Sequence, residues 1–407
     1  MKKPAQTSKP LGLYIHIPFC RSKCAYCDFY SLPAASPAAQ NRYTAALRRH
    51  LAESAALMTS YEADTVYFGG GTPSLLGARR LKGLMKTIRG AFRLSPEAEV
   101  TLEANPDSMG DLRLARSRRR TGVNRISLGV QSADDGELGA IGRVHSFQQA
   151  AEAVQAVRAG GFENVSLDLI YGLPGQTLAS WQRTVDRCAA LEPEHFSCYG
   201  LKVEEGTPLW DRQEGLPDGD LQADMYLWMV ERLAQLGYAQ YEISNFARPG
   251  RASRHNLKYW TLAEYAGFGP GAHSDLGGVR YAFVRDLDAY CQCVESGGDI
   301  LAESERITPW ERELEYLMLG LRTVGGISRQ EFESRCRMNF SPLQDCLERF
   351  ARTGHAREEG GRWHLTPEGF LVSNQIIGQM LDVLAEMRRN RQSAGRPAPF
   401  KTESQPR

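Results

Sequence analysis

Short apolar runs alternate with amphipathic segments along the first half of the chain. The apolar runs are LGLYIHIP, DTVYFGG, EVTLEANP, RISLGVQS, NVSLDLIYG and HFSCYGLKV, all typical of buried strands. Helical spacing follows each run, and in the first helical segment Tyr43, Leu47 and Leu51 share one face. The predicted helices lie near residues 37–58, 77–92, 111–120, 146–160, 177–190 and 219–236. Six such strand–helix units predict an α/β fold with a parallel sheet and right-handed crossovers.

Polar or glycine-rich segments stand at the C-terminal end of the predicted strands. Examples are GGGT after the second strand, EANPD after the third and GVQS at the end of the fourth. An open doubly wound sheet would gather its functional residues near one switch point, whereas a barrel carries them around its whole C-terminal rim. The pattern therefore favours a partial, TIM-like (β/α)6 barrel.

The alternation of strand-like and helical segments ends near residue 240, and the composition of the chain changes there and again near residue 306. Residues 241–305 are rich in glycine, proline and aromatic side chains and are expected to form loops that line a site. From residue 306 helical segments precede a short β pair, which predicts a small winged-helix-like α+β domain. The predicted segments are a flexible N-terminus (1–10), the barrel (11–240), the extension (241–305), the C-terminal domain (306–385) and a disordered tail (386–407).

Composition excludes several classes of protein. The formal net charge of the 407 residues is +1, so no global field points to nucleic acid or an anionic surface as the main partner. The arginine clusters at 116–120 and 388–391 are weak evidence, and we expect no nucleic-acid partner. The N-terminal segment is a poor signal peptide, and no apolar run approaches about twenty residues. A cytoplasmic protein is expected.

Three of the nine cysteines lie within eight positions of the sequence, in CRSKCAYC. Thiolates are soft ligands that suit zinc or iron–sulfur clusters. A structural zinc site needs four ligands, and Cys20, Cys24 and Cys27 supply three. His16 could complete a zinc site, although it lies within an apolar strand. The spacing alone leaves zinc and an iron–sulfur cluster open.

The segment resembles the cluster loop of the radical S-adenosylmethionine (SAM) superfamily, since it follows the first strand of the pattern and Tyr26 precedes the last cysteine. This resemblance implies a [4Fe–4S] cluster bound by Cys20, Cys24 and Cys27. One iron is then left free for SAM, whose C–S bond is cleaved by an electron from the cluster. The sequence does not decide whether SAM cleavage is used on a substrate.

The resemblance also implies a set of SAM-binding residues. Gly70, Gly71 and Thr72 match the superfamily's glycine-rich turn, and Tyr14 and Tyr26 should pack near the ligand. Polar side chains at further strand ends would contact the ammonium, carboxylate or ribose groups of SAM. The expected SAM-binding residues are Tyr14, Tyr26, Gly70, Gly71, Thr72, Glu103, Gln131, Arg143 and Asp168.

FGGGTPS, ISLGVQS and DLIYGLPGQT together resemble the branch of the superfamily related to coproporphyrinogen dehydrogenase, over residues 11–385. Two members of this branch compete: oxygen-independent coproporphyrinogen III dehydrogenases, which act in porphyrin biosynthesis, and heme chaperones of the HemW type. The dehydrogenases carry a further cysteine two positions after the last cluster ligand, where this chain has Phe29. The heme chaperones carry a heme-associated motif similar to HNLKYW at 255–260.

The resemblance to the heme chaperones implies heme contacts by His255, Asn256, Tyr259 and Trp260. His273 and, more distantly, His145 are alternative iron ligands. The alternative to heme contact is a helix start, with asparagine as its cap and the aromatic residues in the core. The resemblance further implies client hemoproteins such as membrane-bound respiratory enzymes, transient docking at the membrane, and dimerisation.

Overall fold

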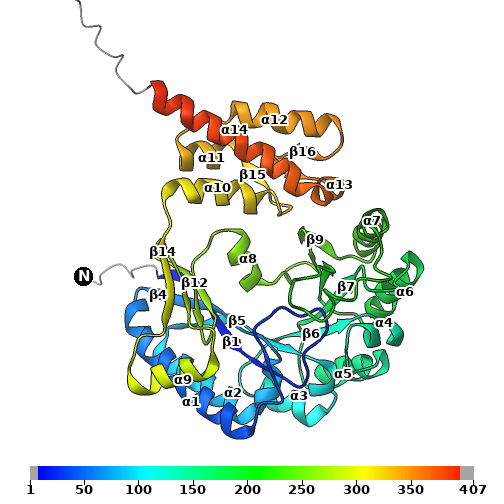
Figure 1. Ribbon diagram of the computed structural model, residues 1–407, viewed down its shortest axis with the longest axis vertical. Coiled ribbons are helices and arrows are strands. Elements are labelled where there is room, and N and C mark those ends of the chain that lie inside the picture. Colours follow the sequence, from blue (N-terminus) through cyan, green and yellow to red (C-terminus); the bar gives the residue numbers. More distant parts are fainter. Residues whose placement is uncertain (1–7, 395–407) are drawn as a thin grey trace, which may run out of the picture. The chain divides into compact units, whose positions relative to one another are not determined.

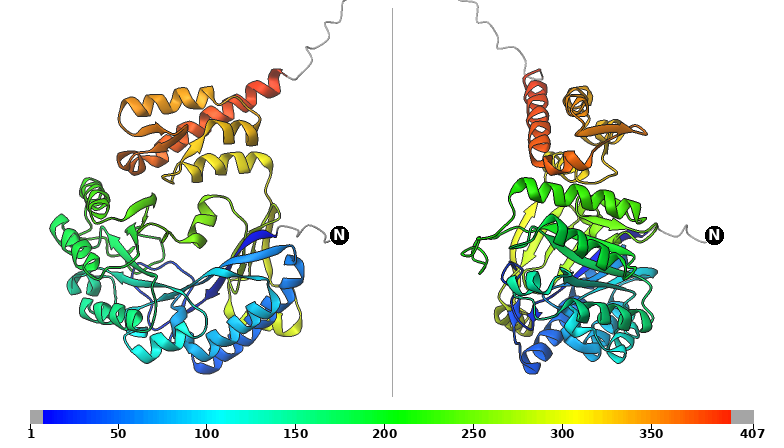
Figure 2. Two further views of the ribbon diagram at one scale, coloured as in Figure 1. Left: turned by 180° about the vertical axis from the view of Figure 1, so that it is seen from behind. Right: turned by 90° about the vertical axis from the view of Figure 1, so that its right-hand side faces the viewer.

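The computed structural model describes residues 8–394. The chain divides into two compact units, Met1–Ile307 and Thr308–Arg407. In the first unit a curved sheet of twelve strands is covered by helices on its outer face (Figures 1 and 2). The second unit is mainly helical and has a small sheet of its own.

Parallel strands form the centre of the large sheet, as the sequence pattern predicts. They are β1 (Lys9–Ile17), β4 (Tyr61–Gly70), β5 (Leu94–Ala104), β6 (Arg125–Gln131), β7 (Val165–Tyr171) and β8 (His195–Gly200), in that order. Beside β1 the sheet continues through β11 (Tyr265–Phe268), β12 (His273–Leu276), β13 (Val279–Phe283) and β14 (Leu301–Arg306). Beside β8 it ends with β10 (Asn245–Ala247) and β9 (Ala239–Glu242). The extension 241–305 thus supplies strands to the barrel sheet as well as loops.

The helices that follow the parallel strands begin and end close to their predicted limits. They are α1 (Pro37–Ser54), α2 (Gly77–Ala91), α3 (Leu112–Arg119), α5 (Phe147–Ala159), α6 (Leu178–Ala189) and α7 (Gly219–Gln235), with α4 (Asp135–Ala140) and α9 (Leu287–Ser296) in addition. In α1 the N-cap Ser36 accepts a hydrogen bond from the amide of Ala39, and Tyr43, Leu47 and Leu51 are buried. Capping and one apolar face therefore suffice to define this helix.

The inner face of the sheet is polar. Glu99, Thr101 and Glu103 alternate along β5 with Val100 and Leu102, which are buried on the opposite side of the strand. Successive side chains of a strand point to opposite faces, so the apolar residues meet the helices and the polar residues meet the barrel interior. The interior is thus built to hold a polar ligand.

Helix α8 (Arg254–Trp260) lies in the gap between the two ends of the curved sheet (Figure 1). Glu99 of β5 accepts hydrogen bonds from the backbone amides of Arg254 and His255, each at 3.1 Å. The ring of His255 also bonds the Thr65 hydroxyl at 2.8 Å. A short polar helix, rather than two further strands, completes the interior of this partial barrel.

The second unit begins with α10 (Pro309–Gly320), and its two longest strands form a hairpin. The other elements are β15 (Ile327–Ser328), α11 (Arg329–Cys336), α12 (Ser341–Arg352), β16 (Ala356–Glu359), β17 (Arg362–Leu365), α13 (Pro367–Leu371) and α14 (Ser373–Ala394). Strand β17 lies between β15 and β16. Phe332, Leu343 and Leu347 are fully buried together with one face of α14. The unit has the winged-helix-like order of elements that the sequence predicts.

The predicted tail differs from the structure. Residues 386–394 continue α14, whereas the sequence predicts a disordered segment from 386 onward. The reason is local, because EMRRNRQSA consists mostly of good helix formers and the first glycine and proline come only at 395 and 397. Residues 1–7 and 395–407, which also belong to predicted flexible segments, lie outside the described residues.

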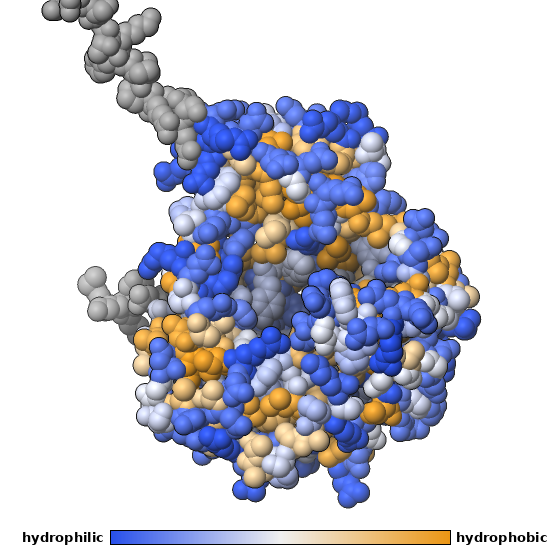
Figure 3. Space-filling view, viewed as in Figure 1, coloured by the Kyte–Doolittle hydropathy of each residue, from blue (hydrophilic) through white to orange (hydrophobic). Residues whose placement is uncertain are grey.

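Hydrophilic side chains cover most of the face shown in Figure 3, and apolar side chains gather there in separate patches. Among the described residues, no helix combines the length and the apolar character needed to cross a membrane.

Glu99→Ala tests the attachment of α8 to the sheet. The substitution removes the acceptor of two buried backbone amides, so we expect the free energy of unfolding to fall by on the order of 3 kcal/mol. Glu97→Ala on the same strand is the matched control, because the Glu97 side chain is exposed, and it should change stability by less than about 0.5 kcal/mol. Urea unfolding measures both, and equal stability of the two variants would contradict the role of Glu99.

Candidate functional site

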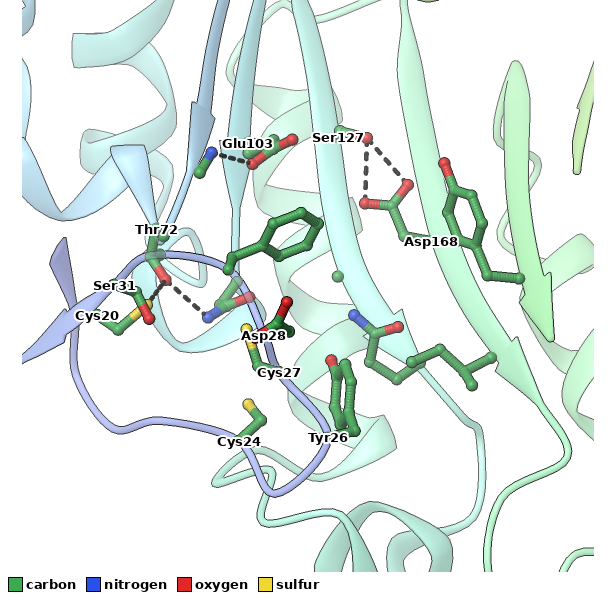
Figure 4. A pocket seen from close by; sticks show the side chains of 18 of the residues that line it. Cys20, Cys24, Tyr26, Cys27, Asp28, Ser31, Thr72, Glu103, Ser127 and Asp168 are labelled. Carbon is green, nitrogen blue, oxygen red and sulfur yellow. Dashed lines mark hydrogen bonds between the residues drawn. The ribbon is translucent and has the colours of Figure 1, made fainter. Parts of the chain in front are cut away.

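A cavity of about 510 Å³ opens at the C-terminal ends of the parallel strands in the first unit. Its walls are the cysteine loop at 20–31, the glycine turn at 70–72 and the ends of β5 to β8. The three cysteines of the loop face it from one side, and Glu103 and Asp168 lie deeper in the barrel (Figure 4). We call this space the rim cavity.

The cysteine loop is held against the barrel by backbone bonds and one aromatic side chain. The amide of Ala25 donates to the carbonyl of Ile141 at 3.0 Å. The side chain of Tyr26 packs against the apolar cluster of Ile141, Ile170 and Leu173. Burial raises the pKa of Tyr26, so its hydroxyl stays neutral. The loop is therefore positioned before any ligand binds.

Two of the three thiols have a donor from the barrel. The Thr72 hydroxyl lies 3.6 Å from the sulfur of Cys20, and a guanidinium nitrogen of Arg143 lies 3.5 Å from the sulfur of Cys24. Hydrogen bonds to sulfur stabilise a thiolate ligand. Burial raises the pKa of the Cys27 thiol, so metal binding must supply the free energy that ionises it.

The residues present fit a three-cysteine iron–sulfur cluster better than zinc. The other ligand considered for zinc, His16, has both ring nitrogens engaged, by the Tyr14 hydroxyl at 3.1 Å and the Tyr30 carbonyl at 3.0 Å. Within residues 8–394 no three His, Cys, Asp or Glu side chains lie close enough to share one ion. An iron–sulfur cluster does not require its three cysteines to share one ion, because each cysteine binds a separate iron and the sulfurs lie further apart.

The glycine turn is packed directly against the end of β1. The amide of Gly71 donates to the Ile17 carbonyl at 2.8 Å, and the amide of Thr72 donates to the Phe19 carbonyl at 2.7 Å. Gly70 has a φ of +112°, and a Cβ there would lie 2.6 Å from the His16 ring. Only glycine permits this conformation and this distance, so the turn needs glycine before any ligand is considered.

Asn105 connects the two residues that contact the thiols. Its amide nitrogen donates to the Thr72 hydroxyl at 3.1 Å, and its amide oxygen accepts from Arg143 at 2.8 Å. Arg143 also donates to the carbonyl of Gly129 at 2.6 Å, whereas its Nε is buried without a partner among the described residues. That unpaired donor, beside the cysteine loop, suits the carboxylate of a bound amino acid.

Two buried carboxyl groups lie in the depth of the cavity. Burial raises the pKa of Glu103 to about 7, although hydrogen bonds from the Tyr67 hydroxyl at 2.7 Å and the Gly70 amide at 3.0 Å oppose the shift. Burial likewise raises the pKa of Asp168, which accepts from Ser127 at 3.0 and 3.2 Å. A cationic or hydroxyl-bearing ligand would stabilise the ionised form of these carboxyl groups, because it would replace the interactions with water that burial removes.

Gln131 has an unusual backbone at the end of β6. Its φ is +69°, and the register between β6 and β7 shifts at this residue. Its side chain lines the rim cavity and makes no hydrogen bond with the described residues. A non-glycine residue in this region is strained, and such strain is concentrated at ligand sites. Gln131 is thus placed to hydrogen-bond a ligand.

The structure brings the predicted SAM-binding residues together around the rim cavity, with one exception. Tyr14 does not line it: its ring packs on Tyr67 and His255 at centroid distances of 6.3 and 6.4 Å, and its hydroxyl bonds His16. Tyr14 is thus outside the lining of the rim cavity, and its contact with SAM stays a prediction. The tie to His16 keeps its hydroxyl in the barrel wall.

The predicted heme residues separate from one another. His255 is 1% exposed, and its ring nitrogens bond Thr65 at 2.8 Å and Tyr259 at 2.9 Å. Burial lowers its pKa to about 3. Both ring nitrogens are hydrogen-bonded in this structure, and the role of His255 as an iron ligand stays a prediction. Asn256 lines the rim cavity, Tyr259 lines a different groove, and Trp260 is half-buried. The N-cap of α8 is Ser253, not an asparagine.

Sequence reasoning missed several polar residues of the cavity. They are Tyr67, Asn105, Ser127, Ser197 and Tyr199. A signal was present, because Ser127, Gly129 and Gln131 alternate along β6, and Ser197 and Tyr199 do so along β8. Polar residues at every second position of a strand that a helix must cover on its other face indicate a polar interior.

Comparisons with known proteins agree with this geometry. Residues 14–188 match the family model of the Radical SAM superfamily, and residues 307–372 match that of the HemN C-terminal domain. The heme chaperone HemW of Bacillus subtilis is 36% identical over 377 residues, which cover 91% of this chain and 99% of the relative. The chain belongs to the HemW family.

A second HemW relative, from Escherichia coli, is 33% identical, with 90% of this chain and 97% of the relative covered. The solved structure of coproporphyrinogen III oxidase (HemN) from Escherichia coli, a radical SAM enzyme, has a TM-score of 0.81. It covers 92% of this chain and 91% of that one at 24% identity, which shows the shared fold. This HemW-family chain thus has the radical SAM fold with a C-terminal domain.

Gly70→Ala tests the close approach of the glycine turn. The substitution forces a side chain into a left-handed backbone and against His16, so we expect a loss of at least ~2 kcal/mol of stability and reduced iron binding after anaerobic reconstitution. Gly90→Ala in α2 is the matched control, since its Cβ would meet nothing, and it should retain full iron. Unfolding curves and iron per chain measure both; normal iron in Gly70→Ala would refute the argument.

Glu103 should make the stability of the metal-free protein depend on pH. Because its folded pKa is about 7 and the ordinary value is 4.5, the folded state holds a proton that the unfolded state has lost between these pH values. The free energy of unfolding should therefore fall as pH rises from 4.5 to 7, by on the order of 3 kcal/mol.

Glu103→Gln should remove this contribution and leave that of Glu242, whose pKa burial also raises to about 7. Urea unfolding at several pH values compares the variant with the wild type. The same pH slope in both would show that Glu103 is ionised in the folded protein.

Proposed function

We propose that this protein is a heme chaperone, which binds heme and delivers it to client hemoproteins. The observation that carries the proposal is the 36% identity to the Bacillus subtilis heme chaperone HemW over nearly the whole of both chains. Identity at this level extends through both units, so it covers the barrel, the extension and the C-terminal domain.

Within this function, Cys20, Cys24 and Cys27 would bind a [4Fe–4S] cluster, and the remaining iron would take SAM. Such a cluster supplies the electron that can cleave the C–S bond of SAM. The unpaired Nε of Arg143 would hold the carboxylate of SAM, and the backbone of Gly70 and Gly71, which lines the rim cavity, would lie beside its amino group. Glu103, Gln131 and Asp168 would orient the remainder of the molecule.

Phe29 supports chaperone function over porphyrinogen dehydrogenation. The dehydrogenases that the sequence resembles carry a cysteine at this position. Phe29 is 69% exposed and belongs to the lining of the rim cavity. An exposed aromatic residue offers an apolar contact but no thiol.

The client would dock transiently, since a carrier must release its ligand. Membrane-bound respiratory enzymes as clients, peripheral contact with the membrane and a homodimer belong to the proposal through the resemblance to heme chaperones. A cytoplasmic location is part of the same proposal.

The proposal is tested with anaerobically reconstituted protein in two assays. Purified protein loaded with one equivalent of hemin should pass heme to an apo-cytochrome, followed by the absorbance of the product. In parallel, the electron resonance of the reduced cluster should change on addition of SAM. Cys20→Ala should lose the brown absorbance of the cluster, whereas Cys293→Ala, on a helix outside the cavity, should keep it.

Two results would overturn the proposal. Failure of the wild type to bind hemin would show that the protein is not a heme chaperone. Conversion of coproporphyrinogen III to protoporphyrinogen IX at catalytic turnover, with SAM and a reductant, would make the protein a dehydrogenase instead. A full cluster signal in Cys20→Ala would refute the ligand assignment alone.

A further inference from the structure

We propose that His195 is a positioning residue for the ligand of the rim cavity, because it fixes the direction of a hydrogen bond that Ser166 donates to Asp168. The inference rests on the proposed function, in which Asp168 helps to orient bound SAM, and it gives a role to a residue outside the cavity. His195 begins β8, is fully buried and does not belong to the lining of the rim cavity.

Asp168 stands at one end of a chain of hydrogen bonds that crosses three strands. The Ser166 hydroxyl on β7 lies 3.4 Å from one oxygen of Asp168 and 2.7 Å from Nδ1 of His195. Nε2 of His195 lies 2.7 Å from the hydroxyl of Tyr241 on β9. That hydroxyl accepts from the backbone amide of Ser253, the N-cap of α8, at 3.3 Å. The chain therefore joins the start of α8 to a carboxyl group of the rim cavity.

The chemistry of its two ends gives this chain one direction. A backbone amide can only donate a hydrogen bond, and an ionised carboxylate can only accept one. Tyr241 accepts from the amide of Ser253, so its own proton is donated to Nε2 of His195. Ser166 has a single hydroxyl proton, and because Asp168 takes it, the Ser166 oxygen accepts from Nδ1. His195 is therefore neutral and carries its proton on Nδ1.

The surroundings of the imidazole agree with this protonation state. Burial lowers the pKa of His195 well below its ordinary value, and the positive charge of Arg125 lowers it further. Arg125 is itself buried, at the start of β6. Burial raises the pKa of Asp168, whereas the Ser127 hydroxyl and the charge of Arg125 oppose that rise. One buried cation thus favours a neutral histidine and an ionised aspartate together, as the direction of the chain requires.

Asp168 depends on neighbouring hydroxyl groups for its hydrogen bonds inside the barrel. Ser127 lies within 3.0 and 3.2 Å of its two oxygens, as Figure 4 shows, and Ser166 approaches one of them from below the cavity. A serine hydroxyl can rotate, and if Ser166 donated to His195 instead, its lone pairs would face the carboxylate. The proton on Nδ1 excludes that arrangement. Hydrogen bonds aligned in one direction also polarise one another, which strengthens the last one.

The tautomer of His195 can be measured directly by nitrogen NMR of the full chain labelled with ¹⁵N-histidine. We expect its Nδ1 to carry the proton and its Nε2 to carry none at neutral pH, because Nε2 accepts from Tyr241. The spectrum of His195→Gln identifies the signals, since they are missing from it. A proton on Nε2, or on both nitrogens at neutral pH, would overturn the proposal.

A matched pair of substitutions tests the two ring nitrogens separately. The side-chain amide of asparagine places its nitrogen near the position of Nδ1, whereas that of glutamine reaches the position of Nε2. His195→Gln therefore loses the donor to Ser166, and we expect the anaerobically reconstituted protein to bind SAM about tenfold more weakly. His195→Asn keeps this donor and should bind SAM within about twofold of the wild type. Equilibrium dialysis with labelled SAM measures both dissociation constants.

Two further variants serve as controls. His50→Gln replaces another buried histidine, which bonds Tyr290 at 2.8 Å and lines a different groove, and it should bind SAM like the wild type. Ser166→Ala removes the same hydrogen bond to Asp168 without changing His195, and it should weaken binding as His195→Gln does. If His195→Gln does not fold, Ser166→Ala decides the question.

The outcomes separate the role of His195 from the proposed function. If the wild type binds SAM and His195→Gln or Ser166→Ala binds it equally well, His195 has no positioning role and the proposed function stands. Equal weakening by His195→Gln and His195→Asn would show that the imidazole only supports the barrel, which also refutes the proposal. If the wild type retains its iron but binds no SAM, the assignment of SAM to the rim cavity fails and the proposal fails with it.

Discussion

The contact between the glycine turn and the end of β1 is the constraint on which the rim cavity depends. Two backbone hydrogen bonds, from Gly71 to Ile17 and from Thr72 to Phe19, join the second strand–helix unit to the start of the cysteine loop. They place the Thr72 hydroxyl beside Cys20, and through Asn105 they fix Arg143 beside Cys24. The position of the thiols is thus set by main-chain geometry, which no side chain other than hydrogen at position 70 would permit.

A polar interior follows from the same architecture and has a cost. Glu103 and Asp168 are held away from water, and the pKa of each is raised by burial. Removing carboxyl groups from water is unfavourable unless hydrogen bonds or an opposite charge compensate. Tyr67, the Gly70 amide and Ser127 compensate only in part. A bound ligand with positive charge and hydroxyl groups would complete the compensation, so ligand binding and stability are coupled in this cavity.

Most of the barrel could be predicted from sequence because its signals are local. Apolar runs, helix caps and glycine turns recur in each unit, and cysteine spacing marks the loop. The environment of single side chains could not be predicted in this way. His255 and Asn256 are neighbours in the sequence, yet His255 is buried beside Thr65 and Tyr259 whereas Asn256 lines the cavity. The cause is a distant contact, because the rotation of α8 is set by Glu99, 156 positions before His255 in the chain. Tyr14 is displaced from the cavity for a similar reason, through its bond to His16. The helical continuation at 386–394 was missed because the proline-rich residues beyond it dominated the composition of the segment.

The use of a seven-residue helix to finish an incomplete barrel has a consequence for how its motif is read. HNLKYW contributes His255 to the interior, Asn256 to the rim cavity and Tyr259 to a separate groove. One short helix therefore contributes side chains to two separate spaces, the rim cavity and the groove that Tyr259 lines. A substitution that rotates or unwinds α8 would therefore change the lining of both spaces at once, so its effect on ligand binding cannot be assigned to one of them alone.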